Sequence, residues 1–207
     1  MSRAKRIREH YEPRIIPGRK NYDVLDWASA RSQRARFAVL ARSVELDGKS
    51  LLDVGCGLGD LLAFLTDRGI AVQYTGVDIV AKMVERAGRQ FPDARFIHAD
   101  PFTEDPFGEE RFDVVFCSGT FNLDLGNLRE FVPRALKRLA GWAREYLVFN
   151  LLHVRAAGYG YCAYYDPAEV LPWVTPIARE VQVIDDYLPN DFTVICRLGD
   201  RGGTPAR

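Results

Sequence analysis

The sequence predicts an α/β fold with a doubly wound, Rossmann-like sheet that ends in an antiparallel hairpin. Short apolar runs alternate with helical runs from residue 50 to residue 152, which is typical of right-handed βαβ units. Phe112–Cys117 is a continuous apolar run, as expected for a strand buried on both faces of a parallel sheet. The last two apolar runs lie too close together for a crossover helix. The 207 residues fit one domain.

The N-terminal elements are the least regular part of the pattern. Residues 1–20 are basic and are interrupted by Pro13, Pro17 and Gly18, so we expect a loose basic arm over residues 1–22. Apolar residues at helical spacing then predict one helix from Asp23 to Val44.

The central elements follow from the alternation of apolar and helical runs. Strands are predicted at Ser50–Val54, Gln73–Asp78, Arg95–His98, Phe112–Cys117 and Glu145–Leu152. Helices are predicted from about Gly59 to Asp67, at Ala81–Gln90, and at Leu125–Leu139 with Pro133 inside.

The C-terminal third departs from the alternation of strands and helices. Pro167–Val174 predicts a short helix, and Glu180–Asp185 and Phe192–Arg197 predict strands separated by only six residues. So short a connection pairs these two strands antiparallel. The glycine-rich residues 199–207 predict a flexible tail.

Charge is unevenly distributed along the chain. The formal net charge is zero, but residues 1–42 hold eleven Lys or Arg against four Asp or Glu, a local net of +7. A solvated basic helix surface explains such an excess more simply than a nucleic-acid stripe does. Nucleic acid is therefore not expected as a partner.

The cysteines and the apolar runs indicate the compartment. Cys56, Cys117, Cys162 and Cys196 have neither C-x-x-C spacing nor a histidine cluster nearby, which favours neither a disulfide framework nor a metal site. No run of eighteen apolar residues and no signal-like segment occurs, so neither secretion nor membrane insertion is indicated. We expect a cytoplasmic protein.

The first predicted strand runs into a glycine-rich turn. Asp53 ends the strand, Gly55, Gly57 and Gly59 follow at alternate positions, and a helix begins. Glycine tolerates positive φ and lets the backbone approach a ligand, while a helix N-terminus presents free N–H groups. The Asp53 carboxylate disfavours a site built only for pyrophosphate, so the ligand is expected to be cationic or rich in hydroxyl and amine donors.

Acidic residues end three successive predicted strands: Asp53, Asp78 and Asp100. In an open α/β sheet the carboxyl ends of the strands form the ligand edge. Asp78 lies 19 residues after Gly59, which matches the position from which a carboxylate accepts hydrogen bonds from ribose hydroxyls. One aspartate could be a turn former or helix cap, and for Asp100 before Pro101 that alternative stands. Three in register favour a binding site.

These motifs together resemble the class I S-adenosylmethionine-dependent methyltransferase family. The resemblance rests on D-x-G-x-G-x-G at Asp53–Gly59, Gly76–Ile79, His98–Asp100 and Phe112–Cys117, and it covers about Lys49–Arg197. The segments Ile15–Tyr22 and Tyr187–Phe192 resemble a small single-domain subgroup of that family. It implies a seven-stranded sheet with an antiparallel last strand, and a methyltransferase domain over residues 23–198 that includes an N-terminal lid helix.

The resemblance also implies a cofactor and residues that hold it. The cofactor would be S-adenosylmethionine, leaving as S-adenosylhomocysteine, with Asp78 on the ribose hydroxyls and Asp100 toward the adenine amino group. The implied cofactor-binding residues are Asp53, Gly55, Cys56, Gly57, Gly59, Asp78, Ile79, Asp100, Pro101 and Ser118. Trp27, Gln33 and Arg36 would form the lid over it.

A nicotinamide dehydrogenase is the main alternative within the same fold. Such an enzyme also has an acidic residue about twenty positions after its glycines, but its fingerprint is G-x-G-x-x-G. Here the third glycine comes one position early, and Asp60 follows it. The C-terminal hairpin also argues against a dehydrogenase.

Candidate catalytic and substrate residues follow the fourth and fifth strands. Ser118–Leu123 should lie beside the methyl group, and it lacks the N-P-P-[YF] pattern of amide and nucleobase methylation. Thr120 and Asn122 could bind substrate, with Asn122 also a candidate catalytic residue, or could cap the next helix. His153 is the first candidate general base, although a loop histidine with its hydrogen bonds satisfied is the favoured interpretation. Tyr159, Tyr161, Tyr164 and Tyr165 could wall a substrate pocket or pack on the core, and of these Tyr164 and Tyr165 are assigned to substrate.

The sequence therefore predicts a methyltransferase that acts on oxygen, nitrogen or carbon of a small molecule. Two alternatives stay open: an RNA methyltransferase that uses the basic arm, and a non-catalytic module that binds S-adenosylmethionine. The acceptor, the need for a base and the oligomeric state are left open by the sequence.

Overall fold

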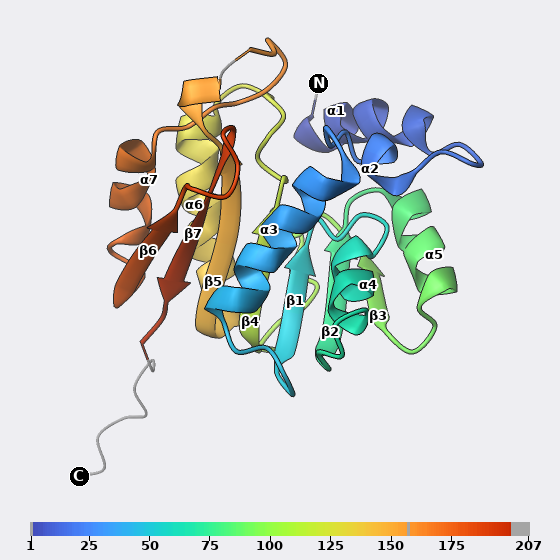
Figure 1. The fold of residues 1–207 in the computed structure, drawn as a ribbon, viewed down its shortest axis with the longest axis horizontal. Coiled ribbons are helices and arrows are strands. Elements are labelled where there is room, and N and C mark those ends of the chain that lie inside the picture. The colour runs from blue at the N-terminus through green and yellow to red at the C-terminus, as the bar shows by residue number, and fades with distance from the viewer. Residues whose placement is uncertain (1, 157, 200–207) are drawn as a thin grey trace.

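The computed structural model describes residues 2–156 and 158–199 and contains a seven-stranded sheet in the order β3-β2-β1-β4-β5-β7-β6 (Figure 1). The strands are β1 Ser50–Val54, β2 Gln73–Asp78, β3 Arg95–His98, β4 Phe112–Ser118, β5 Ala143–Leu152, β6 Glu180–Ile184 and β7 Asp191–Arg197. β1 to β5 pair in parallel, whereas β7 lies antiparallel between β5 and β6. The predicted fold class, including the antiparallel last strand, is confirmed.

Strand order reverses at β1, which pairs with β2 on one side and with β4 on the other. The chain moves outward from β1 to β3 and then returns to the other side of β1 as β4. The carboxyl ends of β1 and β4 therefore flank the crevice where open α/β sheets bind ligands.

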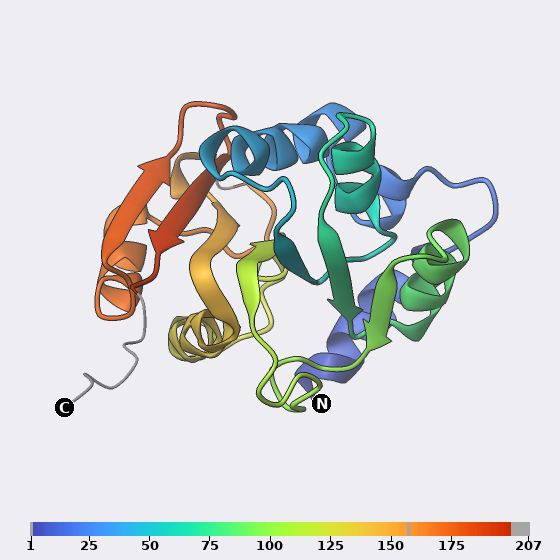
Figure 2. The ribbon, with the colours of Figure 1, turned by 90° about the horizontal axis from the view of Figure 1, so that it is seen from below.

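Helices cover both faces of the sheet (Figure 2). They are α3 Ala30–Ser43, α4 Asp60–Thr66, α5 Ala81–Gln90, α6 Leu128–Trp142 and α7 Pro167–Val174. On one face α3 and α4 bury side chains such as Leu40 and Phe64 against β1, β2 and β4. On the other face α6 and α7 bury Leu136 and Val174 against β4, β5 and β7.

The N-terminal residues are helical, not loose as the sequence suggested. They form α1 Arg3–Tyr11, the 3₁₀ turn η1 Glu12–Arg14, and α2 Asn21–Val24, above the carboxyl edge of the sheet (Figure 1). Ser2 Oγ caps α1 by accepting from the Lys5 N–H at 3.3 Å. No residue of α1 is fully buried, but its partly buried Ile7 and Tyr11 pack on the cluster that contains Val24 and Met83.

The single helix expected from Asp23 to Val44 is also interrupted. α2 ends at Val24, Asp26 has a φ of 60°, and α3 begins at Ala30. Ser29 and Ser32 form a reciprocal capping box that starts α3, with side-chain bonds of 3.1 and 3.2 Å. The break allows the two helices to take different directions around the edge of the sheet.

Smaller differences concern the ends of elements. The helix expected from Leu125 begins three residues later, at Leu128, because Gly126 and Asn127 have positive φ angles of 73° and 52°. A second 3₁₀ turn, η2 Val154–Ala156, follows β5. Of the predicted tail, residues 200–207 lie outside the described residues.

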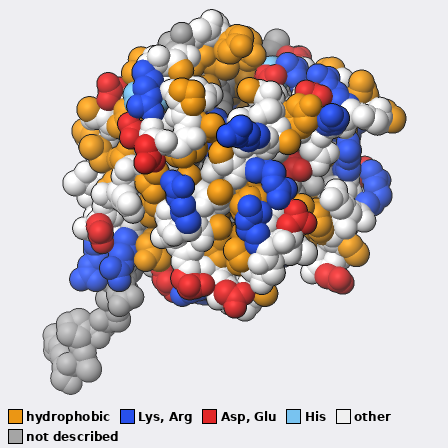
Figure 3. All heavy atoms as spheres, in the orientation of Figure 1, with side chains coloured by type: hydrophobic (Ala, Val, Ile, Leu, Met, Phe, Trp, Pro, Cys, Tyr) orange, Lys and Arg blue, Asp and Glu red, His pale blue; other side chains and the backbone are white. Residues whose placement is uncertain are grey.

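Surface charge is mixed on the face that Figure 3 shows, where Lys and Arg side chains lie among Asp, Glu and hydrophobic ones. Of the four cysteines, Cys56, Cys117 and Cys196 are buried thiols, and Cys162 is partly exposed. None of the helices in the described part of the chain is long and apolar enough to cross a bilayer.

Candidate active site

A cavity of about 420 Å³ lies at the carboxyl edge of the sheet, beneath α1 and α2 and beside α3. Most of the predicted site residues line it: Asp53, Gly55, Cys56, Asp78, Ile79, Asp100, Pro101, Ser118, Thr120, Asn122 and Tyr164. The expected lid residues Trp27, Gln33 and Arg36 also line it. The structure thus brings residues from five parts of the chain to one place.

The glycine turn is shaped by its protein neighbours. Gly55, Gly57 and Gly59 have φ angles of 78°, 54° and 80°, a left-handed conformation that favours glycine. A Cβ at Gly55 would lie 2.4 Å from Thr120 Oγ1, and one at Gly57 would lie 2.7 Å from a methyl of Leu25. Gly55 lines the cavity, whereas Gly57 and Gly59 lie behind its lining.

Asp78 holds this turn in place while it faces the cavity. Its Oδ2 accepts from the Gly57 N–H and its Oδ1 from the Val80 N–H, both at 2.9 Å. Burial raises the pKa of Asp78, and these backbone donors act against the rise. Each carboxylate oxygen can accept a further bond, so Asp78 keeps capacity for hydroxyl donors of a ligand.

Asp53 is buried beside the same turn. Tyr74 Oη donates to its Oδ2 at 2.7 Å. Burial raises the pKa of Asp53 to about 7, with smaller upward contributions from Asp78 and Asp60, while the Tyr74 bond lowers it. Asp53 therefore changes charge near neutral pH. Because it lines the cavity, it could face a cationic group of a ligand.

Asp100 completes the row of acidic residues. Its Oδ1 accepts from the Phe102 N–H at 3.0 Å, and its own N–H donates to Glu104 Oε1 at 2.9 Å. The turn that was the alternative role for Asp100 is therefore present. Asp100 also lines the cavity, so the two roles do not exclude each other.

Asp60, the first residue of α4, was not selected as a site residue from the sequence. It accepts from Asn21 Nδ2 at 2.7 Å and from Gln33 Nε2 at 3.1 Å. An acidic residue in the first turn of a helix is a recognisable signal, but its partners lie 39 and 27 residues away. Asp60 ties α2 and α3 to the glycine turn.

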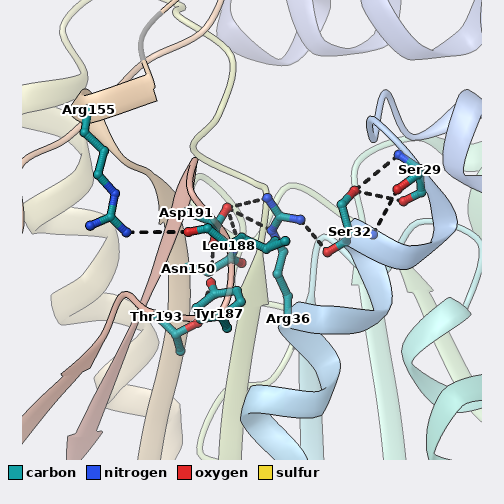
Figure 4. Close-up of polar contacts among 9 residues, drawn as sticks. All are labelled: Ser29, Ser32, Arg36, Asn150, Arg155, Tyr187, Leu188, Asp191 and Thr193. Atoms are coloured by element: carbon teal, nitrogen blue, oxygen red, sulfur yellow. Dashed lines mark hydrogen bonds and ion pairs between the residues drawn. The ribbon is translucent and has the colours of Figure 1, made fainter.

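A buried polar network anchors α3 to the last hairpin (Figure 4). Arg36 Nε donates to Asp191 Oδ2 at 2.9 Å, and Arg36 Nη1 donates to the Ser32 carbonyl at 2.6 Å. Asn150 Nδ2 donates to Asp191 Oδ1 at 3.0 Å, and Tyr187 Oη also donates to that oxygen. Arg36 and Asp191 are 2% and 0% exposed.

The network reaches the cavity through Trp27. The Arg36 guanidinium lies 4.4 Å from the centroid of the Trp27 ring. A Cβ at Gly119 would lie 2.7 Å from that ring, so Gly119 allows Trp27 to approach the segment after β4. The Tyr187–Phe192 segment thus has a structural role, because it holds the residues that fix Arg36.

The segment after β4 carries polar atoms without protein partners. Thr120 Oγ1 donates to the Val54 carbonyl at 3.1 Å, and the Ala163 N–H donates to the Asn122 carbonyl at 2.8 Å. Ser118 Oγ and Asn122 Oδ1 are buried without a hydrogen-bond partner. Neither Thr120 nor Asn122 caps α6, which starts at Leu128 without a side-chain cap.

His153, the expected general base, is not among the described residues that line the cavity. Its Nδ1 accepts from the Arg155 N–H at 3.2 Å, and its ring packs on Phe192 with centroids 5.5 Å apart. Its Nε2 lies 4.0 Å from Asp185 Oδ2. This geometry favours the other interpretation, a histidine whose bonds are satisfied locally, over contact with a reacting atom.

The tyrosines divide between cavity and core. Tyr159, Tyr161 and Tyr164 line the cavity, and the Tyr159 N–H donates to Tyr164 Oη at 3.0 Å. Tyr165 is fully buried, and its hydroxyl donates to the Phe121 carbonyl at 3.3 Å. Tyr165, which the sequence assigned to substrate, is therefore held in the core beneath the cavity.

Arg3 on α1 is a second cavity residue that the sequence did not reveal. Its guanidinium carbon lies 4.0 Å from the centroid of the Phe131 ring, and its Nη2 donates to the Thr120 carbonyl at 3.4 Å. Its Nε is buried and has no hydrogen-bond partner. No local signal could have found it, since its partners lie more than a hundred residues away.

The donor and acceptor set fits a ligand with both amine and hydroxyl groups. Three carboxylates supply acceptors along one wall, from Asp53, Asp78 and Asp100. The partnerless atoms of Arg3, Ser118 and Asn122 belong to residues of the same cavity lining. Buried polar atoms are normally paired, so these atoms indicate a site that a ligand completes.

Comparisons with known proteins agree on one family. Residues 51–141 match the model of a methyltransferase domain. A putative methyltransferase of Mycobacterium tuberculosis is 30% identical over 162 residues, which are 73% of this chain and 94% of that protein. The malonyl-[acyl-carrier protein] O-methyltransferase of Acetivibrio thermocellus is 32% identical over 142 residues. That match covers 65% of this chain but only 49% of the relative, so the chain spans about half of its length.

A solved structure has the same fold over nearly the whole chain. The magnesium protoporphyrin IX methyltransferase from Synechocystis, crystallised with bound S-adenosylmethionine, has a TM-score of 0.68 and 16% sequence identity. The match covers 96% of this chain and 98% of that one.

Proposed function

This chain belongs to the class I S-adenosylmethionine-dependent methyltransferase family, and from that premise we propose that it transfers a methyl group from S-adenosylmethionine to a small-molecule acceptor. The acceptor atom is an oxygen, a nitrogen or a carbon. One observation carries the proposal: the carboxylates of Asp53, Asp78 and Asp100 line a single cavity beside the glycine turn. Residues 23–198 form the methyltransferase domain under this proposal, and α1 from the basic arm helps to cover its site.

The residues that would hold the cofactor are those of the acidic wall. Asp78 would accept hydrogen bonds from the ribose hydroxyls and Asp100 from the adenine amino group, while Asp53 and the turn at Gly55 would lie near the amino acid part. When bound, S-adenosylmethionine supplies a methyl group on a positively charged sulfur, which is already a strong electrophile. The negative wall suits that charge.

The protein's own contribution is chiefly placement and exclusion of water. Effective molarity from correct placement can supply about 7 to 11 kcal/mol of a reaction barrier. Trp27, fixed by Arg36, covers one side of the cavity, and α1 covers another. Ser118 and Asn122 present partnerless polar atoms from the segment after β4, where they can orient an acceptor.

The contacts of the basic arm support a small-molecule acceptor over RNA. Arg6 Nη1 donates to the Leu125 carbonyl at 2.6 Å, Arg14 Nη1 donates to the His10 carbonyl at 2.6 Å, and Arg3 lines the cavity. These arginines serve internal contacts and do not form a free basic stripe.

Transfer is tested by incubating the protein with methyl-labelled S-adenosylmethionine and a small-molecule extract of the cells that express it. We expect one labelled product, identified by mass spectrometry, and no label in added RNA. The control is the same mixture with Ser118→Ala and Asn122→Ala together, which should slow labelling. Tight cofactor binding with no labelled product would instead support a non-catalytic binding module, and salt-sensitive labelling of RNA would support the nucleic-acid alternative.

A further inference from the structure

Arg3 is a positively charged residue that lines the cavity without an ion-pair partner among the described residues. An arginine side chain stays protonated under physiological conditions, so its charge needs compensation wherever it is buried. The Arg3 guanidinium carbon lies 4.0 Å from the centroid of the Phe131 ring and 5.2 Å from that of the Phe102 ring, and these two rings meet edge to face. Within the described residues its one hydrogen bond runs to the Thr120 carbonyl at 3.4 Å, and its buried Nε has no partner there. Among residues 2–156 and 158–199, no carboxylate forms an ion pair with it.

The other charged groups that line the cavity have close partners. Arg36 is paired with Asp191, and Asp60 accepts from Asn21 and Gln33. Asp26 lies 3.0 Å from His10 and 3.7 Å from Arg14. Asp53 accepts from Tyr74, and Asp78 and Asp100 accept from backbone N–H groups.

We propose that Arg3 binds a carboxylate of the methyl acceptor, so that the acceptor class is small carboxylic acids. The inference rests on the proposed function and names the substrate class for that same site. The planar guanidinium matches a carboxylate, and its contacts with the Phe131 and Phe102 rings limit the orientations it can take. Its bond to Thr120 places it against the segment after β4, together with the partnerless Ser118 Oγ and Asn122 Oδ1.

The acids already in the cavity limit how much negative charge an acceptor can add. Asp53, Asp78 and Asp100 line the same cavity as Arg3; burial lowers the pKa of Arg3, and the Asp100 charge acts against that fall. A phosphate monoester would bring nearly two negative charges to a site with one unpaired arginine. A carboxylate brings one negative charge, and its planar group can lie against the Arg3 guanidinium.

The test uses the whole chain with its affinity tag after Arg207, away from Arg3. Four proteins are compared: wild type, Arg3→Gln, Arg3→Lys, and Lys5→Gln as a matched control, because Lys5 is an exposed cation of the same helix that lies outside the cavity lining. A small-molecule extract is separated by anion exchange at pH 7 into retained and unretained fractions. Each fraction is incubated with methyl-labelled S-adenosylmethionine, and the retained fraction is also tested after phosphatase treatment.

We expect labelled product from the retained fraction, unchanged by phosphatase. Arg3→Gln should raise the KM for the active fraction about 10- to 100-fold, because it removes one charge-assisted pair with the substrate. Arg3→Lys should recover part of that loss, because it keeps the charge without the planar fork. Lys5→Gln should match wild type, and all four proteins should bind S-adenosylhomocysteine within about twofold in isothermal titration.

Several results would overturn the assignment. They are labelling only from the unretained fraction, loss of labelling after phosphatase, and an Arg3→Gln protein as active as wild type. An equal loss of S-adenosylhomocysteine affinity in Arg3→Gln would assign Arg3 to the cofactor's own carboxylate instead. If Arg3→Gln does not fold by circular dichroism, the KM of Arg3→Lys compared with that of Lys5→Gln decides the question. Failure of wild type to bind S-adenosylhomocysteine or to label any fraction would refute the proposed function itself.

Discussion

Two opposing effects act on the negative charge of Asp53. Burial penalises its negative charge, whereas Tyr74 stabilises it through a 2.7 Å hydrogen bond, and the net effect is a pKa of about 7. In the unfolded chain the pKa of an aspartate is about 3.9. The folded protein therefore binds an additional proton between these two values, and stability from this group is lost as the pH rises through the folded pKa.

This difference in pKa predicts that Asp53→Asn gains stability relative to wild type as the pH rises, in the ligand-free protein. Between pH 5 and pH 8, the free energy of unfolding of Asp53→Asn should rise relative to wild type by about 2 kcal/mol, because asparagine does not ionise. Urea denaturation of both proteins at the two pH values measures it. A stability difference that stays constant over this range would show that Asp53 does not titrate there.

The site residues found from the sequence differ from those missed in how far along the chain their partners lie. Asp53, Asp78 and Asp100 were predictable because each ends a strand, and parallel strands end at one edge of a sheet. Arg3 and Asp191 were not predictable, because each acts through a partner 117 or 155 residues away. His153 has the right chemistry and follows the right strand, but its ring packs toward Phe192 instead of facing the cavity.

At the scale of elements, the central strands follow their apolar runs closely. β1, β2, β3, α5 and α7 have the expected bounds, because burial against the sheet determines where they begin and end. α1 was not predicted, because its apolar contacts are few, chiefly those of Ile7 and Tyr11, and because bonds from Arg3 and Arg6 to the distant segment after β4 also attach it. The break before α3 depends on a cap between two serines, a weaker signal than the Ser/Thr and Glu/Gln pair of a standard capping box.

The buried pair between α3 and β7 is expected to stabilise the packing of these two elements. Asp191→Asn removes the charge that balances Arg36 inside the protein and should lower the free energy of unfolding by about 3 to 5 kcal/mol. Asp67→Asn is the matched control, because Asp67 pairs with Arg34 of the same helix at 3.2 Å on the surface. That change should cost less than about 1 kcal/mol. Chemical denaturation of both variants measures the difference, and equal losses would contradict this role for the buried pair.

At the scale of the whole molecule, the cavity is built by two parts of different character. The sheet edge supplies the acidic wall and the glycine turn, on strands with extensive parallel pairing. The N-terminal helices and the last hairpin supply the cover, joined to that edge through Asp60 and Arg36. The first part was predictable from motifs in the sequence. The second was not, because it depends on contacts between distant segments.

The central claim, that this cavity is a site for S-adenosylmethionine, is tested most directly by isothermal titration with S-adenosylmethionine and S-adenosylhomocysteine. Wild type should bind both, and Asp78→Ala should bind each more weakly by about 1.5 to 3 kcal/mol, the value of hydrogen bonds to a charged group. Asp67→Ala, on the exposed side of α4, should bind like wild type. Absence of binding of either compound to wild type at millimolar concentration would contradict the account.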